Sequence, residues 1–146
     1  MEIIYNPLRG KHAIKLQVKD TDIVILSEQD QLPLESAQNN ERILFDGFLF
    51  KAALPLSNEL KQIVENISHI DFGKIMNSMP ELKGYSRKNS ELSISDYRGS
   101  FHYDFTIANP EINDNPEAVR LHNLIQSLFT VIELPDWYDY RKNRSK

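Results

Sequence analysis

A histidine and an aspartate that are two positions apart are the residues of this sequence best suited to chemistry. His102 and Asp104 alternate with aromatic and aliphatic residues, so they should share the polar face of one strand. Same-face neighbours on a strand lie about 6.6 Å apart, because the chain rises about 3.3 Å per residue. A metal ion could bridge that gap, and His122 could complete the site. These residues define one alternative function, a metal-dependent or hydrolytic enzyme.

Other chemical signatures argue against an enzyme. A metal site needs a third ligand and catalysis needs a nucleophile, whereas the polar face of an amphipathic strand is usually only hydrated. The chain has no cysteine, which excludes a thiolate nucleophile and an iron–sulfur site. The tripeptide Asp71-Phe72-Gly73 matches a kinase motif in letters only, since no glycine-rich loop or catalytic-loop signature accompanies it. We therefore expect a protein that is not an enzyme and that uses no metal or cofactor.

The most distinctive feature of the chain is a long acidic segment. No basic residue occurs between residues 20 and 41, and this stretch carries a net charge of −6. We expect Ser27 to Glu41 to form a loop, and long loops in compact domains are usually functional or disordered. Its carboxylates would steer a basic partner protein, while apolar and aromatic anchors would supply most of the affinity. The residues predicted to bind the partner are Asp20, Asp22, Glu28, Asp30, Leu32, Leu34, Glu35, Trp137 and Tyr138.

Charge is distributed unevenly along the chain. Residues 1–140 contain 13 basic and 21 acidic residues, a net charge of −8, whereas residues 141–146 contain four basic residues and no acidic one. An acidic body repels nucleic acid and attracts basic proteins, through a field that salt weakens. The aromatic rings before the tail could stack on bases, but Asp136 and Asp139 lie among them. A nucleic-acid partner is therefore not expected, and we predict one domain over residues 1–140 followed by a basic, disordered tail over 141–146.

The hydrophobic pattern predicts three β-hairpins. Apolar and polar residues alternate in several runs, which is typical of half-buried strands. Asp46-Gly47 favours a tight turn, with a bulge at Gly47 in a single strand as the alternative, and Asp96 to Gly99 is a second turn candidate. The paired runs are residues 14–18 with 23–26, 43–45 with 48–50, and 92–94 with 101–107.

Two amphipathic helices are predicted. Ser57 is suited to cap the first, which carries an apolar stripe from Leu60 to Ile67 and which we expect Gly73 to end or kink. The second begins at Asn115-Pro116-Glu117 and continues to Glu133. Helices with one apolar face need a sheet to cover that face. The sequence therefore predicts an α+β fold, a mostly antiparallel sheet built from three β-hairpins with two amphipathic helices packed on one face.

These features together predict a small acidic protein of the cytoplasm. The N-terminus lacks the basic start and apolar core of a signal peptide, and no segment has the roughly 20 apolar residues of a membrane helix. We expect a protein-binding module, in its most specific form an immunity or antitoxin-type inhibitor that neutralises a basic toxin, for example a nuclease. The alternatives are the enzyme based on His102 and Asp104, and a homo-oligomeric structural or assembly protein that buries its strand edges.

Overall fold

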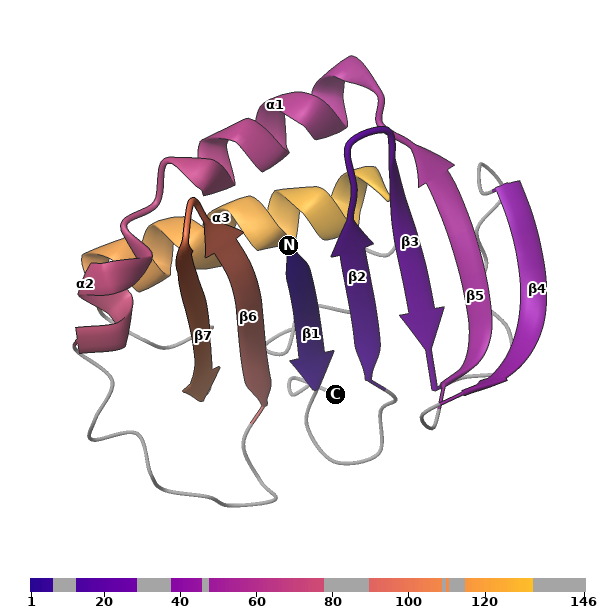
Figure 1. Cartoon of the computed structure of the whole chain (residues 1–146), viewed down its shortest axis with the longest axis horizontal. Helices are drawn as coiled ribbons and strands as arrows, with labels where there is room; N and C mark the ends of the chain where they lie inside the picture. The colour runs from indigo at the N-terminus through magenta and orange to yellow at the C-terminus, as the bar shows by residue number, and fades with distance from the viewer. Residues whose placement is uncertain are drawn as a thin grey trace, which may run out of the picture.

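The described part of the chain forms an antiparallel sheet of seven strands with three helices. The computed structural model describes residues 1–6, 13–28, 38–45, 48–77, 90–108, 110 and 115–132. The strands are β1 (Glu2–Asn6), β2 (Ile14–Val18), β3 (Asp22–Ser27), β4 (Gln38–Phe45), β5 (Phe48–Pro55), β6 (Glu91–Arg98) and β7 (Phe101–Ala108). The helices are α1 (Asn58–Ser68), α2 (Phe72–Asn77) and α3 (Pro116–Val131) (Figure 1). This arrangement confirms the predicted α+β class.

All three predicted hairpins form, as β2–β3, β4–β5 and β6–β7. Phe45 pairs with Phe48 across separate strands, so the alternative of a single strand bulged at Gly47 is wrong. The strand order is β4-β5-β3-β2-β1-β6-β7, and every neighbouring pair is antiparallel. The sheet therefore has β4 at one edge and β7 at the other.

Strand β1 joins the hairpins into one sheet, and the sequence reasoning did not predict it. It pairs with β2 on one side and with β6 on the other. Ile3 and Tyr5 are fully buried, whereas Glu2 and Ile4 are only partly buried. The alternation that reveals strands was present in these residues, but the run is only five residues long. Without β1, the β2–β3 and β6–β7 hairpins would have no neighbour in common.

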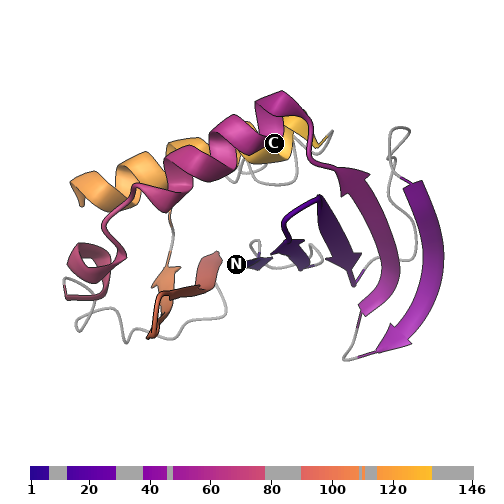
Figure 2. The same ribbon diagram turned by 45° about the horizontal axis from the view of Figure 1, so that its top comes forward.

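The two faces of the sheet differ in what covers them. Figure 2 shows α1 and α3 lying side by side over one face. Apolar side chains of the central strands form one buried core with those of the helices. The other face, which we call the open face, carries polar side chains on β6 and β7, as is usual for an antiparallel sheet with one hydrated face. Ring contacts within the core include an edge-to-face pair between Tyr5 of β1 and Phe129 of α3, with centroids 6.3 Å apart.

Both long helices begin as predicted. The Ser57 hydroxyl accepts a hydrogen bond from the Leu60 backbone N–H at 3.2 Å, and the Asn115 side chain accepts one from the Ala118 N–H at 3.1 Å. Such caps satisfy backbone donors that have no partner within the first turn. None of the helices in the described ranges has the length and apolar character that crossing a membrane requires.

Three boundaries differ from the sequence prediction. Gly73 neither ends nor kinks the first helix: α1 ends at Ser68, and Gly73 lies in the separate helix α2. Strand β6 continues through the predicted turn to Arg98, because the hairpin closes at Gly99-Ser100, where Gly99 has a φ of 65°. Both ends of the predicted loop over 27–41 belong to strands, because β3 includes Ser27 and β4 begins at Gln38. Residue propensities identify residues that favour turns. The register between paired strands decides which of those residues form the turn.

Glu117 ties the start of α3 to the start of α2. Its carboxylate accepts a hydrogen bond from the Asp71 backbone N–H at 3.0 Å and another from Arg120 Nη1 at 2.9 Å. The hydrogen bond from the Asp71 backbone is the main cause of a lowered Glu117 pKa, and Arg120 and Lys74 lower it further. The carboxylate form of Glu117 is therefore favoured by folding.

Replacing Glu117 with Gln should reduce the dependence of stability on acid pH. Because folding lowers the pKa of Glu117, its contribution is complete above the ordinary glutamate pKa of about 4.3 and is lost as the pH falls through the lowered value. The wild-type protein should thus be more stable than Glu117→Gln at neutral pH, and the difference should disappear in acid. Urea unfolding followed by circular dichroism measures both. Glu59→Gln, in the first turn of α1, is the matched control and should retain the wild-type acid dependence of stability. If Glu59→Gln reduced that dependence as much as Glu117→Gln, the acid dependence could not be assigned to Glu117.

Candidate functional site

The structure separates the predicted partner-binding residues that it describes. Asp20 is exposed in the turn between β2 and β3, and Asp22 begins β3. Glu28 follows the other end of β3, about 20 Å away at about 3.3 Å per residue, and its carboxylate accepts a hydrogen bond from the Ala13 backbone N–H at 2.7 Å. Glu28 therefore does not share a surface with Asp20. Six further predicted residues lie outside the described ranges: Asp30, Leu32, Leu34, Glu35, Trp137 and Tyr138.

Asp20 and Asp22 lie at the end of the molecule where α1 begins. The Leu56 backbone N–H donates a hydrogen bond of 3.0 Å to the Thr21 carbonyl, which fastens the β2–β3 turn to the segment entering α1. Glu59 adds a third carboxylate in the first turn of that helix, where the helix dipole favours an acid. We call Asp20, Asp22 and Glu59 the acidic corner. Lys19, next in the chain, offsets one of these charges.

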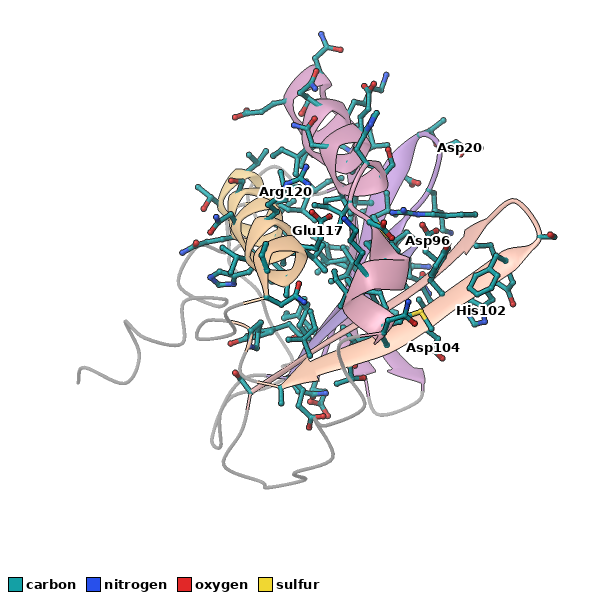
Figure 3. All side chains as sticks on the ribbon, turned by 90° about the vertical axis from the view of Figure 1, so that its left-hand side faces the viewer. Asp20, Asp96, His102, Asp104, Glu117 and Arg120 are labelled. Atoms are coloured by element: carbon teal, nitrogen blue, oxygen red, sulfur yellow. The ribbon has the colours of Figure 1, made fainter. Side chains whose placement is uncertain are left out.

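His102 and Asp104 lie on the open face of β7, but they are not partners of each other. Cross-strand register places His102 opposite Tyr97 and Asp104 opposite Ser95. His102 Nε2 lies 2.8 Å from Ser95 Oγ, and its ring stacks on Tyr97 with centroids 4.2 Å apart and planes inclined by 12°. Figure 3 shows both labelled residues along the β6–β7 hairpin, on the side away from the helices. The histidine is thus held by β6 rather than by the acid two residues away.

The Ser95–His102 hydrogen bond joins a hydroxyl to an imidazole, which is the beginning of a nucleophile–base pair. Hydrolysis would also need a third group that orients the base and donors that stabilise an oxyanion. Asp104 does not supply the orienting bond, because no hydrogen bond joins it to His102 among those the structure describes. Over the same residues, no group of three or more histidine and carboxylate side chains is placed to hold a metal ion.

The tip of the β6–β7 hairpin exposes aromatic side chains, which the sequence reasoning did not single out. Tyr97 is 71% exposed on the open face, and Phe101 is 55% exposed on the opposite face. Phe101 contacts Tyr103, whose ring packs in turn against Phe72 of α2. The missed signal is the hairpin turn itself: with the turn at Gly99-Ser100, the rings on each side of it must project at the tip.

Arg98 fixes this hairpin to the helices. Its guanidinium donates to the Ile70 carbonyl at 2.7 Å and to the Ile67 carbonyl at 3.1 Å, where α1 ends. Its Nε lies 3.3 Å from the Asp96 carboxylate, and the guanidinium carbon lies 3.7 Å from the centre of the Phe72 ring. The planar fork of arginine suits such a site, because it can satisfy several acceptors and stack at the same time. The aromatic tip is therefore carried on a rigid base.

A hollow of about 520 Å³ lies between α1 and α3, at the surface turned away from the sheet. It has a mixed polar and apolar lining. The lining residues are Glu59, Gln62, Ile63, Ser127, Thr130 and Val131. It contains one member of the acidic corner, Glu59, and no residue of the β6–β7 hairpin.

Comparison with protein-family models, with curated proteins and with solved structures gives no match to this chain.

Proposed function

We propose that this protein acts by binding a basic partner protein, as an immunity or antitoxin-type inhibitor that neutralises a toxin such as a nuclease. The observation that carries the proposal is the presentation of Asp20 and Asp22 on a rigid hairpin end. Asp20 is exposed, and neither carboxylate forms an ion pair within the described part of the chain. These charges are therefore available to a ligand.

The hairpin end is held in a fixed geometry. The Lys19 backbone N–H donates a hydrogen bond of 2.9 Å to the Asp22 carbonyl, which closes the turn. Beyond it, β3 is buried from Ile23 to Ser27, so the strand that carries the turn is anchored in the core. A charge on a preorganised support loses little conformational entropy when a partner binds.

An acidic surface matches the partner class in the proposal. A nuclease must bind phosphate, so its active site carries lysine and arginine side chains. Carboxylates placed over that site would pair with the same cations and exclude the substrate. Electrostatic complementarity of this kind raises the association rate more than it raises the intrinsic affinity. The apolar anchors proposed for affinity, Leu32, Leu34, Trp137 and Tyr138, belong to segments outside the described residues.

Replacing Asp20 and Asp22 together by asparagine should slow association with the partner about tenfold at low salt, because steering by a local field contributes at least that factor. The partner is first isolated by co-purification from the native host and mass spectrometry. Association and dissociation rates are then measured by surface plasmon resonance in low and high salt. The dissociation rate should change less than the association rate, and the effect should shrink at high salt.

The matched control is Glu65→Gln with Glu91→Gln, which removes the same charge from α1 and from the start of β6. This variant should associate within a factor of about two of the wild type, since steering depends on where the charge lies. Equal slowing in both variants would mean that only net charge matters. An unchanged rate in the Asp20/Asp22 variant would contradict the proposed site. If the partner is a toxin, co-expressing this protein with it should restore growth of a host that the toxin alone inhibits.

A further inference from the structure

The two edges of the sheet differ in how well they resist pairing with another strand. Strand β4 pairs with β5 through two irregularities in register, whereas β7 pairs with β6 over all eight of its residues without one. Natural sheets protect their edges with bulges, charged side chains and prolines. Strand β7 contains no bulge, lysine or proline, and Asp104 is its one acidic side chain. Within the described ranges, no strand pairs with the outer side of β7. It is a regular template for one more strand.

The hydrogen-bond pattern identifies the residues of β7 that face outward. Met1 and Val18 exchange backbone hydrogen bonds of 2.8 and 3.4 Å, and in antiparallel strands the bonding direction alternates from residue to residue. This alternation continues through the register of β1 with β6 and then through that of β6 with β7. It directs the backbone N–H and C=O groups of every second residue of β7 toward the free edge. The outward residues are His102, Asp104, Thr106 and Ala108.

We propose that β7 pairs antiparallel with β7 of a second copy of this chain, so that His102 of each copy lies opposite Asp104 of the other. A twofold axis makes such a contact self-complementary, so the pair of His102 with Asp104 is formed twice, once on each side of the axis. Both side chains lie on the open face, away from α1 and α3. Helix α2 packs against the opposite, helix-facing side of β7, through the contacts of Phe72 with Tyr103 and Phe105. The two sheets become one continuous sheet across the axis.

Charge and aromatic contacts favour this register over shifts toward the C-terminal end of β7. A shift that places Asp104 opposite Asp104 brings like charges together, which is unfavourable in a cross-strand pair. A further shift places Asp104 opposite Thr106 and leaves Phe101 beyond the end of the partner strand. The proposed register instead sets Phe101 opposite Phe105, and Tyr103 opposite Tyr103, on the helix-facing side. Aromatic pairs of this kind stabilise sheets, and the half-exposed ring of Phe101 would be covered.

The contacts of the His102 ring with β6 decide which of its nitrogens would serve the proposed pair. Stacking on Tyr97 fixes the plane of the ring, and the Ser95 hydroxyl occupies Nε2, which leaves Nδ1 as the atom that meets a carboxylate of the second copy. A hydrogen bond between imidazole and carboxylate is stronger than one between neutral groups. This surface is separate from the acidic corner, so the dimer and the proposed partner can be tested independently.

Two charge variants test the pairing. His102→Asp makes both outward positions acidic, and Asp104→Lys makes them basic, so each variant sets like charges opposite one another in its own dimer. Each should weaken self-association about tenfold. An equimolar mixture should associate at least as strongly as the wild type, because every facing pair then joins opposite charges. Analytical ultracentrifugation from micromolar to millimolar concentration measures this, and circular dichroism establishes that each variant is folded.

Glu65→Lys, which reverses the same charge on the exposed side of α1, is the control and should self-associate like the wild type. The proposal is overturned if the wild type is monomeric at every concentration, including the case in which β7 takes up an extended segment of a different protein. It is also overturned if the wild type dimerises but neither variant alters the dimer, or if the two folded variants fail to associate with each other. Recovery of association in the mixture alone would establish both the strand and the register.

Discussion

Replacing Ile3 with alanine should lower the free energy of unfolding by about 3–4 kcal/mol, within the range measured for buried Ile-to-Ala changes. Ile3 is fully buried on β1, between the sheet and the helices, and pairs with Leu16 and Ile94 in the neighbouring strands. The truncation leaves a cavity at the centre of the core that the surrounding strands cannot fill. Urea unfolding followed by circular dichroism measures the change, and the melting temperature should fall by roughly 10 °C.

Ile4→Ala is the matched control, because it makes the same truncation at the adjacent residue on the opposite face. Ile4 is only partly buried, so its replacement should cost about 1–2 kcal/mol. The contrast tests whether β1 is a central strand with its odd residues facing the helices. Equal losses from the two variants, or a larger loss from Ile4→Ala, would show that the register assigned to β1 is wrong.

Replacing Arg98 with alanine should cost about 2–3 kcal/mol, a value below that for fully buried ion pairs because the side chain remains 25% exposed. The variant removes the donors to the carbonyls of Ile67 and Ile70 and leaves the Asp96 carboxylate without its guanidinium. It also removes the cation from the face of Phe72. Unfolding by urea measures the loss, and hydrogen exchange should show faster opening where α1 ends.

Two variants separate the parts of this effect. Arg98→Lys keeps the charge but cannot reproduce the planar fork, so it should recover less than half of the lost stability. Arg120→Ala removes another arginine that pairs with an acid, but its side chain is 58% exposed, and such surface pairs contribute about 0.2–1 kcal/mol. If Arg120→Ala proved as destabilising as Arg98→Ala, the interactions of Arg98 with α1 would not be the cause.

Short-range patterns were sufficient for most of the secondary structure. The hairpins were predictable because side-chain direction alternates along a strand. Burial of one face therefore produces an alternation of apolar and polar residues in the sequence. The helix starts were predictable because a cap is a local contact, as between Ser57 and Leu60 or between Asn115 and Ala118. Strand β1 was missed because five residues carry a weak pattern, and its position depends on partners far away in the sequence.

The candidate site was harder to predict than the fold. His102 and Asp104 were correctly placed together on the polar face of one strand, but the actual partners of His102 are Tyr97 and Ser95. Those contacts depend on the register of β6 against β7, which differs from the prediction because the turn lies at Gly99-Ser100. Asp20 and Glu28 looked like members of one acidic segment, yet a strand separates them.

The sequence by itself determined the class of the fold, the hairpins, the helix starts and the acidic character of the chain, since each follows from composition or from neighbours a few residues apart. Only the tertiary structure decided that β1 lies between β2 and β6, that Arg98 of β6 binds the end of α1, and that β7 is left as a regular edge. The physical reason is that these features are set by backbone pairing and packing between distant segments. Strand pairing uses the same main-chain N–H and C=O groups at every residue. The sequence of a strand therefore does not identify which distant strand it pairs with.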